Sequence, residues 1–336
     1  MKRILIGLAV VLVVGCGAAL FGMRWIDSRI SSPHAPEAGA TRDITIARGM
    51  NARSVAAALE QADVLEDGRD LVWWLWWTDL GASIQAGDYR FDEAVSVEDV
   101  TRIITEGRVR LFPVTLPEGS NRWQAAIAIA SAGFGDEEAA LRSFMRVDLI
   151  ADLDPEGTDL EGYLFPETYL VPSGTTTDQV VDLMVAAFRE TWDAGLGARA
   201  SELGWSVREV VTLASLIEAE TPSADERGLV SAVFHNRLER GMLLQTDPTV
   251  LYARWLAGKD GRTIYMSDLR RDSPYNTYLY PGLPAGPIGS PRASSLDAAL
   301  DPAESDFLYF VSRNDGTHAF STNLRDHNTL VNEYQR

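Results

Sequence analysis

The chain has 336 residues, with 48 aspartate and glutamate residues against 30 lysine and arginine residues, and its formal net charge at pH 7 is −18. This acidic balance argues against nucleic acid as a partner, because phosphate contacts need clustered lysine and arginine side chains. A single cysteine excludes an intramolecular disulfide, and four scattered histidines give no metal-ligand spacing. We therefore expect no metal and no other cofactor.

The chain opens with an apolar segment that has the length of a membrane span. Lys2 and Arg3 precede an uncharged run over residues 4–23. A helix of about 20 residues spans ~30 Å, the thickness of a bilayer core, and positive charges before the run favour a cytoplasmic N-terminus. Residues 1–25 are therefore predicted to hold this N-terminus and a single-pass anchor in the cell (inner) membrane. Everything after them is expected in the periplasm or another extracytoplasmic space.

Lipidation is the alternative to this anchor. The tetrapeptide Val13-Val14-Gly15-Cys16 is similar to a lipoprotein processing site, which would leave Cys16 lipidated. The apolar run continues past Cys16 to Met23, where a lipoprotein normally turns polar. The length of the run favours the anchor.

A linker and a small domain are predicted next. Residues 26–42 contain a stretch rich in proline, alanine and serine without apolar periodicity, which indicates a linker. Residues 43–110 mix strand-like and helical patterns, which predicts a small α+β subdomain. A helix within it begins at a capping box at Ser96 and ends at Gly107. Tryptophans 73, 74, 76 and 77 are expected to form a core-facing helical stripe, with sugar stacking or a membrane interface as alternatives.

The larger region, residues 111–336, is organised around two predicted helices with a break between them. The first begins at a capping box at Ser206 and ends at Pro222, which cannot continue a helix. Ser223 and Glu226 have the spacing of a second capping box, so Glu226 is expected to cap the following helix rather than to catalyse. We expect an α+β domain here.

Glu218 is the candidate catalytic residue of this region. It lies in the last turn of the first predicted helix, on the flank of the apolar face. Partial burial and the negative helix end both disfavour an ionised carboxylate, which favours a protonated general acid near neutral pH. A solvated surface glutamate is the structural alternative. Glu220, two residues on, is expected to point to a different side of the helix.

Three segments carry aromatic and polar side chains that suit a neutral polyhydroxyl ligand: residues 160–172, 245–249 and 273–291. The first is either one wall of a sugar groove or a buried loop packed by its own rings. The second predicts a fixed extended turn, and the third is a long irregular segment, which is usually functional. Their candidate substrate-binding residues are Glu161, Tyr163, Gln245, Thr246, Asp247, Tyr275, Asn276 and Thr277.

Several blocks of sequence resemble the YceG-like family, the membrane-anchored endolytic murein transglycosylases. They are LEGYLFPETY from Leu160, LASLIEAET from Leu213, VFHNRL from Val233, LQTDPTV from Leu244, SPYNTY from Ser273, GLPAGPI from Gly282 and THAFSTN from Thr317. Residues 43–110, with the sequence GDYRF, resemble the LysM-like subdomain of that family. Two positions depart from it, since Ala219 stands where the family often has lysine and Asp326 where it often has glutamate.

The resemblance implies a lytic transglycosylase that cuts the bond between N-acetylmuramic acid and N-acetylglucosamine in nascent glycan strands. The products end in 1,6-anhydro-N-acetylmuramic acid, strand elongation stops, and Glu218 is the catalytic acid. The implied partners are peptidoglycan glycan strands, the membrane and peptidoglycan synthases. Two alternatives stay open. One is a lysozyme-type hydrolase with Asp247 or Glu161 as its second carboxylate, and the other is a non-catalytic wall-binding scaffold.

Overall fold

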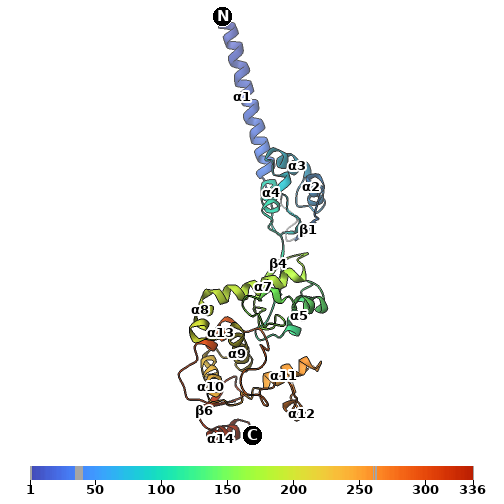
Figure 1. Cartoon of the computed structure of the whole chain (residues 1–336). Helices are drawn as coiled ribbons and strands as arrows, with labels where there is room; N and C mark the ends of the chain where they lie inside the picture. Colours follow the sequence, from blue (N-terminus) through green and yellow to red (C-terminus); the bar gives the residue numbers. More distant parts are fainter. Residues whose placement is uncertain (1, 35–40, 260, 262, 336) are drawn as a thin grey trace. The chain divides into compact units, whose positions relative to one another are not determined.

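The computed structural model describes residues 2–34, 41–259, 261 and 263–335, and within its first helix it describes no side chains for residues 2–12, 16, 18 and 19. The chain folds into two compact units, residues 1–112 with 171–174, and residues 113–170 with 175–336. We call them the N-terminal unit and the C-terminal unit. The N-terminal unit contains α1 (Lys2–Ser31), β1 (Arg42–Ile46), α2 (Ala52–Gln61), α3 (Gly68–Trp77), a 3₁₀ turn (Gly81–Ser83), β2 (Gly87–Phe91) and α4 (Val97–Glu106) (Figure 1).

A two-stranded sheet and three helices enclose the core of the N-terminal unit. Strands β1 and β2 are antiparallel, with Ile44 opposite Tyr89, and alternate residues of β1 are buried as the period of a strand requires. The predicted capping box at Ser96 begins α4, and Gly107 ends it in the left-handed conformation at φ 68°. The predicted small α+β arrangement is therefore present.

Helix α1 extends into the segment predicted to be a linker, so this prediction is wrong as far as Ser31. Ile30 is buried in the core of the N-terminal unit and Ile26 packs against it, which fixes the end of the helix there. Residues 35–40 of the predicted linker lie outside the described residues. Within the part of the chain that the structure describes, no helix is both long and apolar enough to cross a membrane. Most side chains on which the anchor prediction rests lie outside the described ones, and the anchor stays a prediction.

Only part of the tryptophan stripe of α3 faces the core as predicted. Trp73 and Trp74 are partly buried and pack against the core beside the fully buried Leu71 and Leu75, whereas Trp76 and Trp77 are 75% and 65% exposed. A helix presents only one face to the core, so the residues directly after Leu75 turn outward. Trp73 also stacks on the exposed Trp77, with ring centroids 5.7 Å apart.

The C-terminal unit is mainly helical. Strand β5 (Tyr309–Ser312) pairs with β6 (His318–Ser321) within it. Strand β3 (Leu111–Thr115) pairs with β4 (Thr168–Pro172), and three of the five residues of each of these strands belong to this unit. Its helices are α5 (Arg122–Ser131), α6 (Glu137–Ser143), α7 (Thr177–Thr191), α8 (Gly197–Leu203), α9 (Val207–Glu220), α10 (Arg227–Glu239), α11 (Asp247–Leu256), α12 (Met266–Leu269), α13 (Ala293–Leu300) and α14 (Leu324–Tyr334). Short irregular turns of helix lie at Val147–Leu149, Trp192–Leu196 and Ala224–Glu226.

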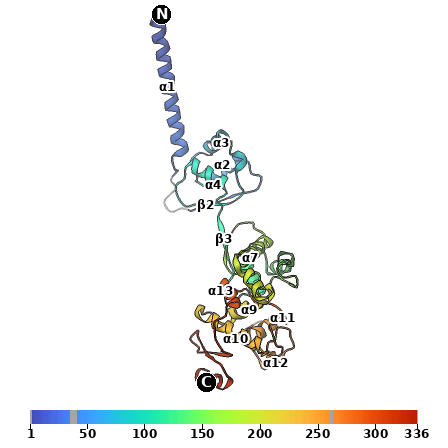
Figure 2. The ribbon, with the colours of Figure 1, turned by 60° about the vertical axis from the view of Figure 1, so that its left-hand side comes forward.

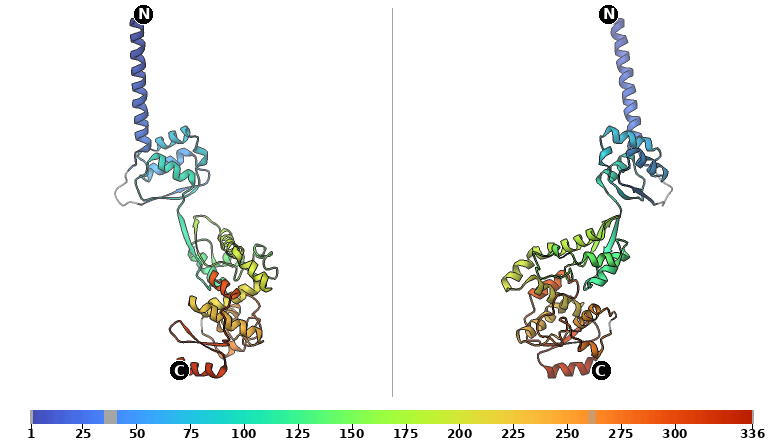
Figure 3. Two further views of the ribbon diagram at one scale, coloured as in Figure 1. Left: turned by 90° about the vertical axis from the view of Figure 1, so that its left-hand side faces the viewer. Right: turned by 45° about the vertical axis from the view of Figure 1, so that its right-hand side comes forward.

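Helix α9 forms the centre of this unit, and α10 and α13 pack against it (Figures 1 and 2). Its predicted capping box is present, because the Ser206 side chain accepts a hydrogen bond from the Glu209 backbone and the Glu209 carboxylate accepts one from the Ser206 backbone. Every residue from Val210 to Glu218 is buried. Strands β5 and β6 form a hairpin with Phe310 opposite Phe320, and α14 lies beside it (Figure 3).

The second predicted capping box does not form. Ser223 makes no side-chain cap, and α10 begins only at Arg227. Glu226 turns instead to β6, where its carboxylate accepts hydrogen bonds from the backbone N–H of His318 at 2.9 Å and faces the ring Nδ1 of His318 at 2.8 Å. The backbone N–H and the imidazole of His318 together bind the Glu226 carboxylate better than the single backbone N–H that a capping box would offer it.

Candidate active site

Glu218 lies at the end of the buried α9 and faces the start of α13. Arg292, the residue before α13, donates through Nη2 to Oε1 at 2.8 Å, and its Nε lies 2.9 Å from Oε1 and 3.0 Å from Oε2. The Arg292 backbone and the Ser295 hydroxyl also donate to Oε2, at 3.2 Å and 2.7 Å. The side chain is therefore no solvated surface glutamate, since the residue is only 8% exposed and both its oxygens are bonded.

These contacts place two positive groups beside Glu218 that the sequence pattern did not show. They are the guanidinium of Arg292 and the N-terminus of α13. The Glu218 carboxylate in turn raises the pKa of Arg292, mainly through their hydrogen bond.

A close backbone contact holds the loop before α5 over Glu218. Gly119 donates to the carbonyl of Ser290 at 2.8 Å, and Ser290 donates to the carbonyl of Ser120 at 2.9 Å. Gly289 has to be glycine for this pairing, because a Cβ there would lie 2.7 Å from the Gly119 carbonyl oxygen. The contact brings the loop against the catalytic candidate, so that a Cβ on Gly119 would lie 3.6 Å from the Glu218 Cγ.

The segment after α10 meets α9 through Glu220. The Thr246 hydroxyl donates to the Glu220 carboxylate, and burial raises the pKa of Glu220 to about 6. Glu220 thus points to a different side of α9 than Glu218, as predicted, and lies against the predicted binding segment. Asp247 is exposed and accepts a 2.6 Å hydrogen bond from the Tyr278 hydroxyl, and Gln245 is exposed with a left-handed φ of 48°. The predicted extended turn is only two residues long, because α11 begins at Asp247.

Glu161 is buried at a different place in the unit. Its Oε2 accepts hydrogen bonds from the Arg122 backbone at 3.1 Å and from the Tyr252 hydroxyl at 2.9 Å, while Oε1 has no partner among the described residues. Burial raises its pKa to about 8. The neighbouring Gly162, at φ 84°, turns the chain where a Cβ would lie 2.5 Å from the Pro287 side chain. A carboxyl in this environment is neutral at pH 7.

Aromatic rings gather beside Glu161. The Tyr252 ring lies 4.8 Å from the ring of Tyr275 and 5.6 Å from that of Trp123, and Trp123 stacks on Trp255 with centroids 5.6 Å apart. Burial raises the pKa of Tyr275 to about 12. The sequence pattern identified Tyr275 but not its aromatic partners, which come from α5 and α11.

Three other predicted binding residues are buried, and their polar atoms are engaged within the protein. The Asn276 amide donates to the carbonyls of Leu269 and Arg271 at 3.1 Å and 2.9 Å. The Thr277 hydroxyl accepts from the Thr246 backbone at 3.1 Å. The Tyr163 hydroxyl donates to Asp154 at 2.7 Å, which confirms the packed-loop interpretation for that ring.

The candidate residues therefore form three neighbourhoods. Glu218 lies with Arg292 and Ser295, neither of which the sequence analysis identified. Gln245, Thr246, Asp247 and Thr277 lie with Glu220, and Glu161 lies with the aromatic rings. The sequence does contain a signal for α13. Leu296 and Leu300 are four residues apart, as on one face of a helix, and Pro291 lies just before the helix begins. Arg292 could therefore have been placed at the N-cap.

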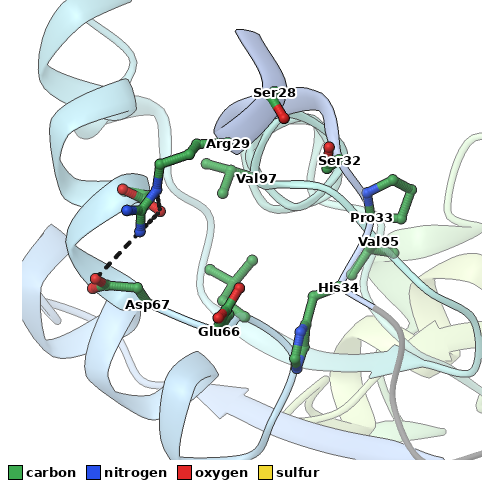
Figure 4. Close-up of a pocket in the computed structure, with 11 residues that line it drawn as sticks. Ser28, Arg29, Ser32, Pro33, His34, Glu66, Asp67, Val95 and Val97 are labelled. Carbon is green, nitrogen blue, oxygen red and sulfur yellow. Dashed lines mark hydrogen bonds and ion pairs between the residues drawn. The ribbon is translucent and has the colours of Figure 1, made fainter. Parts of the chain in front are cut away.

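No group of three or more histidine, cysteine, aspartate or glutamate residues in the described part of the chain is placed to hold a metal ion. A polar pocket does lie in the N-terminal unit, between the end of α1 and the loop before α3 (Figure 4). Some of its charged side chains form ion pairs. Arg29 donates to Asp70 at 2.8 Å, and the His34 ring lies 2.8 Å from an oxygen of Asp63. The catalytic candidate does not line this pocket.

Comparison with known proteins identifies similar chains. The model of the YceG-like family matches residues 44–333. The endolytic murein transglycosylase of Bacillus subtilis (strain 168) is 33% identical over 342 residues, which cover 96% of this chain and 91% of that protein. The enzyme of the same name from Streptococcus pneumoniae (strain D39 / NCTC 7466) is 27% identical over 99% of this chain and 65% of its own length. A crystal structure of a YceG-like protein from Listeria monocytogenes matches with a TM-score of 0.60 and 30% identity, covering 86% of this chain and 98% of that one.

Proposed function

Because the chain belongs to the YceG-like family, we propose that it is an endolytic murein transglycosylase that cleaves peptidoglycan glycan strands. The observation that carries the proposal is the agreement of two independent facts. Relatives with this activity in their names match nearly the whole chain. The residue predicted to be the acid, Glu218, is a buried carboxylate with an arginine and a serine bonded to it.

In the proposed mechanism Glu218 acts twice. As a carboxylic acid it protonates the glycosidic oxygen between N-acetylmuramic acid and N-acetylglucosamine, and the bond to the anomeric carbon breaks. As a carboxylate it then takes the proton from the 6-hydroxyl of the muramic acid residue, whose oxygen bonds to the anomeric carbon. The product carries a 1,6-anhydro ring, and Glu218 returns to its protonated form. No water and no second carboxylate enter the reaction.

We assign the predicted binding residues two different tasks. Gln245, Asp247 and Tyr275 have side chains at or near the surface and contact the glycan in this proposal. Thr246, Thr277, Asn276 and Tyr163 are buried and hold the binding segments in shape. Glu161 shapes the aromatic neighbourhood as a neutral carboxyl, and its raised pKa of about 8 makes it a poor second carboxylate for a hydrolase.

We also propose where the reaction takes place. The uncharged run over residues 4–23 anchors the chain in the cell membrane, and its length and the preceding Lys2 and Arg3 support this. The folded units then work outside the cytoplasm on nascent strands, close to peptidoglycan synthases, and cleavage ends strand elongation. Residues 43–110 act as a LysM-like subdomain that keeps the glycan near the enzyme.

Product analysis tests the reaction. Full-length protein in detergent is incubated with uncrosslinked glycan strands, and the new ends are identified by mass spectrometry. The proposal expects 1,6-anhydro ends. Reducing ends would show that water attacks and would establish the lysozyme-type alternative, whereas strands that bind without any new end would establish the wall-binding scaffold.

A further inference from the structure

Three charged side chains gather around the catalytic carboxyl. Arg292, directly before α13, binds Glu218 together with the Ser295 hydroxyl, Glu118 comes from the loop before α5, and Arg227 is the first residue of α10. On its own helix, Glu218 is followed by Glu220. The Arg292 guanidinium lies between two carboxylates, 2.8 Å from Glu218 and 3.7 Å from Glu118. This cluster is more than a pair that stabilises the fold, because one of its members is the proposed acid.

The resting arrangement conflicts with the first step of the proposed reaction. A general acid has to hold a proton on one oxygen and give it to the glycosidic oxygen, whereas N–H and O–H donors already point at both oxygens of Glu218. Arg292 therefore has to leave Glu218 when substrate binds. The side chain of Arg292 is 32% exposed and that of Glu118 is 49% exposed, so the guanidinium lies at the boundary between the buried carboxylate and solvent.

A second arginine, Arg227, adds positive charge that would favour the binding of an anionic ligand beside Arg292. Arg227 is only 4% exposed, its Nη2 donates to the carbonyl of Pro222 at 3.2 Å, and its Nε has no partner among the described residues. Burial and the nearby charge of Arg292 lower the pKa of Arg227. An unpartnered N–H on a buried guanidinium costs free energy unless an acceptor reaches it. An added carboxylate would relieve the repulsion between these two arginines.

We propose that Arg292 is a movable clamp that occupies both oxygens of Glu218 in the free protein and transfers to a carboxylate of the bound glycan strand, which frees Glu218 to act on the glycosidic oxygen. This inference rests on the proposed function and names a specificity-determining residue for it. The net charge of the chain supports this proposal. A chain of charge −18 repels an anionic strand, so the strand needs local positive charge at the place where it binds. Arg292 exchanges one carboxylate for another without any covalent change, and the proton that Glu218 then donates comes from solvent.

Two carboxylates on a glycan strand fit the clamp. The peptide stems carry carboxylates, and an amidase that removes the stems leaves the lactyl carboxylate of N-acetylmuramic acid. The shared chemistry is a carboxylate within reach of a guanidinium. Strands whose carboxylates have been converted to amides lack this charge but keep the glycosidic bond and its 6-hydroxyl.

The test compares cleavage rates on native, amidase-treated and carboxyl-amidated strands between pH 4.5 and 8. Wild type should cleave native strands at least roughly tenfold faster than carboxyl-amidated ones, the effect of about one charge-assisted hydrogen bond. Arg292→Gln should lose this preference and cleave amidated strands faster than wild type does. Arg292→Lys, which keeps the charge, should keep part of the preference. If amidase-treated strands are cleaved as fast as native strands, the carboxylate that Arg292 binds is the lactyl carboxylate. If they are cleaved as slowly as carboxyl-amidated strands, it belongs to the peptide stem.

Arg199→Gln is the matched control. Arg199 lies in α8 and forms an exposed ion pair, at 2.7 Å, with Asp297 of α13. This variant should behave as wild type. A wild type without preference for charged strands would overturn the clamp, as would an Arg292→Gln variant that loses rate equally on all strands. Wild type that cleaves no strand at all would instead refute the proposed function.

Discussion

Glu161 gives the prediction whose magnitude follows most directly from the structure. The residue is 3% exposed, and burial raises the pKa of its carboxyl from 4.5 to about 8. A raised pKa in the folded state means that the folded protein holds the proton more tightly than the unfolded chain. The resulting stability is fully present below pH 4.5 and is lost as the pH rises through about 8. At about 1.4 kcal/mol per pH unit, the folded state loses on the order of 5 kcal/mol over this window.

The Glu161→Gln variant isolates this effect, because an amide does not ionise but still accepts hydrogen bonds from Tyr252 and the Arg122 backbone. At pH 4.5 the variant should be less stable than wild type by about 1–3 kcal/mol, since its added N–H groups are buried without acceptors. Its stability relative to wild type should then rise by about 3–5 kcal/mol between pH 4.5 and 8. Urea unfolding followed by tryptophan fluorescence measures the difference at each pH.

Glu167→Gln is the control, because Glu167 is exposed in the same segment. Its stability relative to wild type should not change over the same pH range. A flat difference for Glu161→Gln would refute the burial argument, and the carboxyl would then have to be ionised and solvated in the native protein.

Two further substitutions test the packing and the binding segment. Arg237 is buried and donates to the carbonyls of Leu308 and Leu244, both at 2.7 Å. Arg237→Met should therefore lower the free energy of unfolding, measured in urea, by about 2–4 kcal/mol. A loss below about 0.5 kcal/mol would show that these hydrogen bonds do not stabilise the fold. Asp247→Asn should raise KM for glycan strands up to about tenfold while kcat stays within twofold, because a proposed glycan contact weakens without touching the reacting atoms. Steady-state kinetics that show an equal loss in kcat would place Asp247 in the chemical step instead.

The sequence predicts the position of Glu218 well because the determinants are local. The capping box at Ser206 and the apolar spacing of α9 are contained within a single helix. The same holds for the hairpin, whose Asn314-Asp315-Gly316 turn has the composition that a tight turn demands.

The electrostatic environment of Glu218 was beyond such reasoning because it is non-local. Arg292 lies 74 residues away in sequence, and only the folded chain places it on the carboxylate. Glu226 is a second example of a non-local effect. The sequence around it has the spacing of a capping box, but the donors that its carboxylate binds come from His318, 92 residues later. The start of α11 differs, because Pro248 near the N-terminus of a helix is a local signal that was available.

The most direct test of the central claim measures anhydro-end formation by wild type, Glu218→Gln and Glu220→Gln on uncrosslinked strands at pH 6 and 7. Both carboxyls lie near the end of α9, and the pKa of about 6 at Glu220 makes it the natural rival acid. Thermal unfolding of each variant confirms that it is folded. The account predicts that Glu218→Gln loses at least about 100-fold in rate, the usual contribution of a general acid, while Glu220→Gln stays within tenfold of wild type. A folded Glu218→Gln variant that keeps more than a tenth of the wild-type rate, or a larger loss in Glu220→Gln, would contradict it.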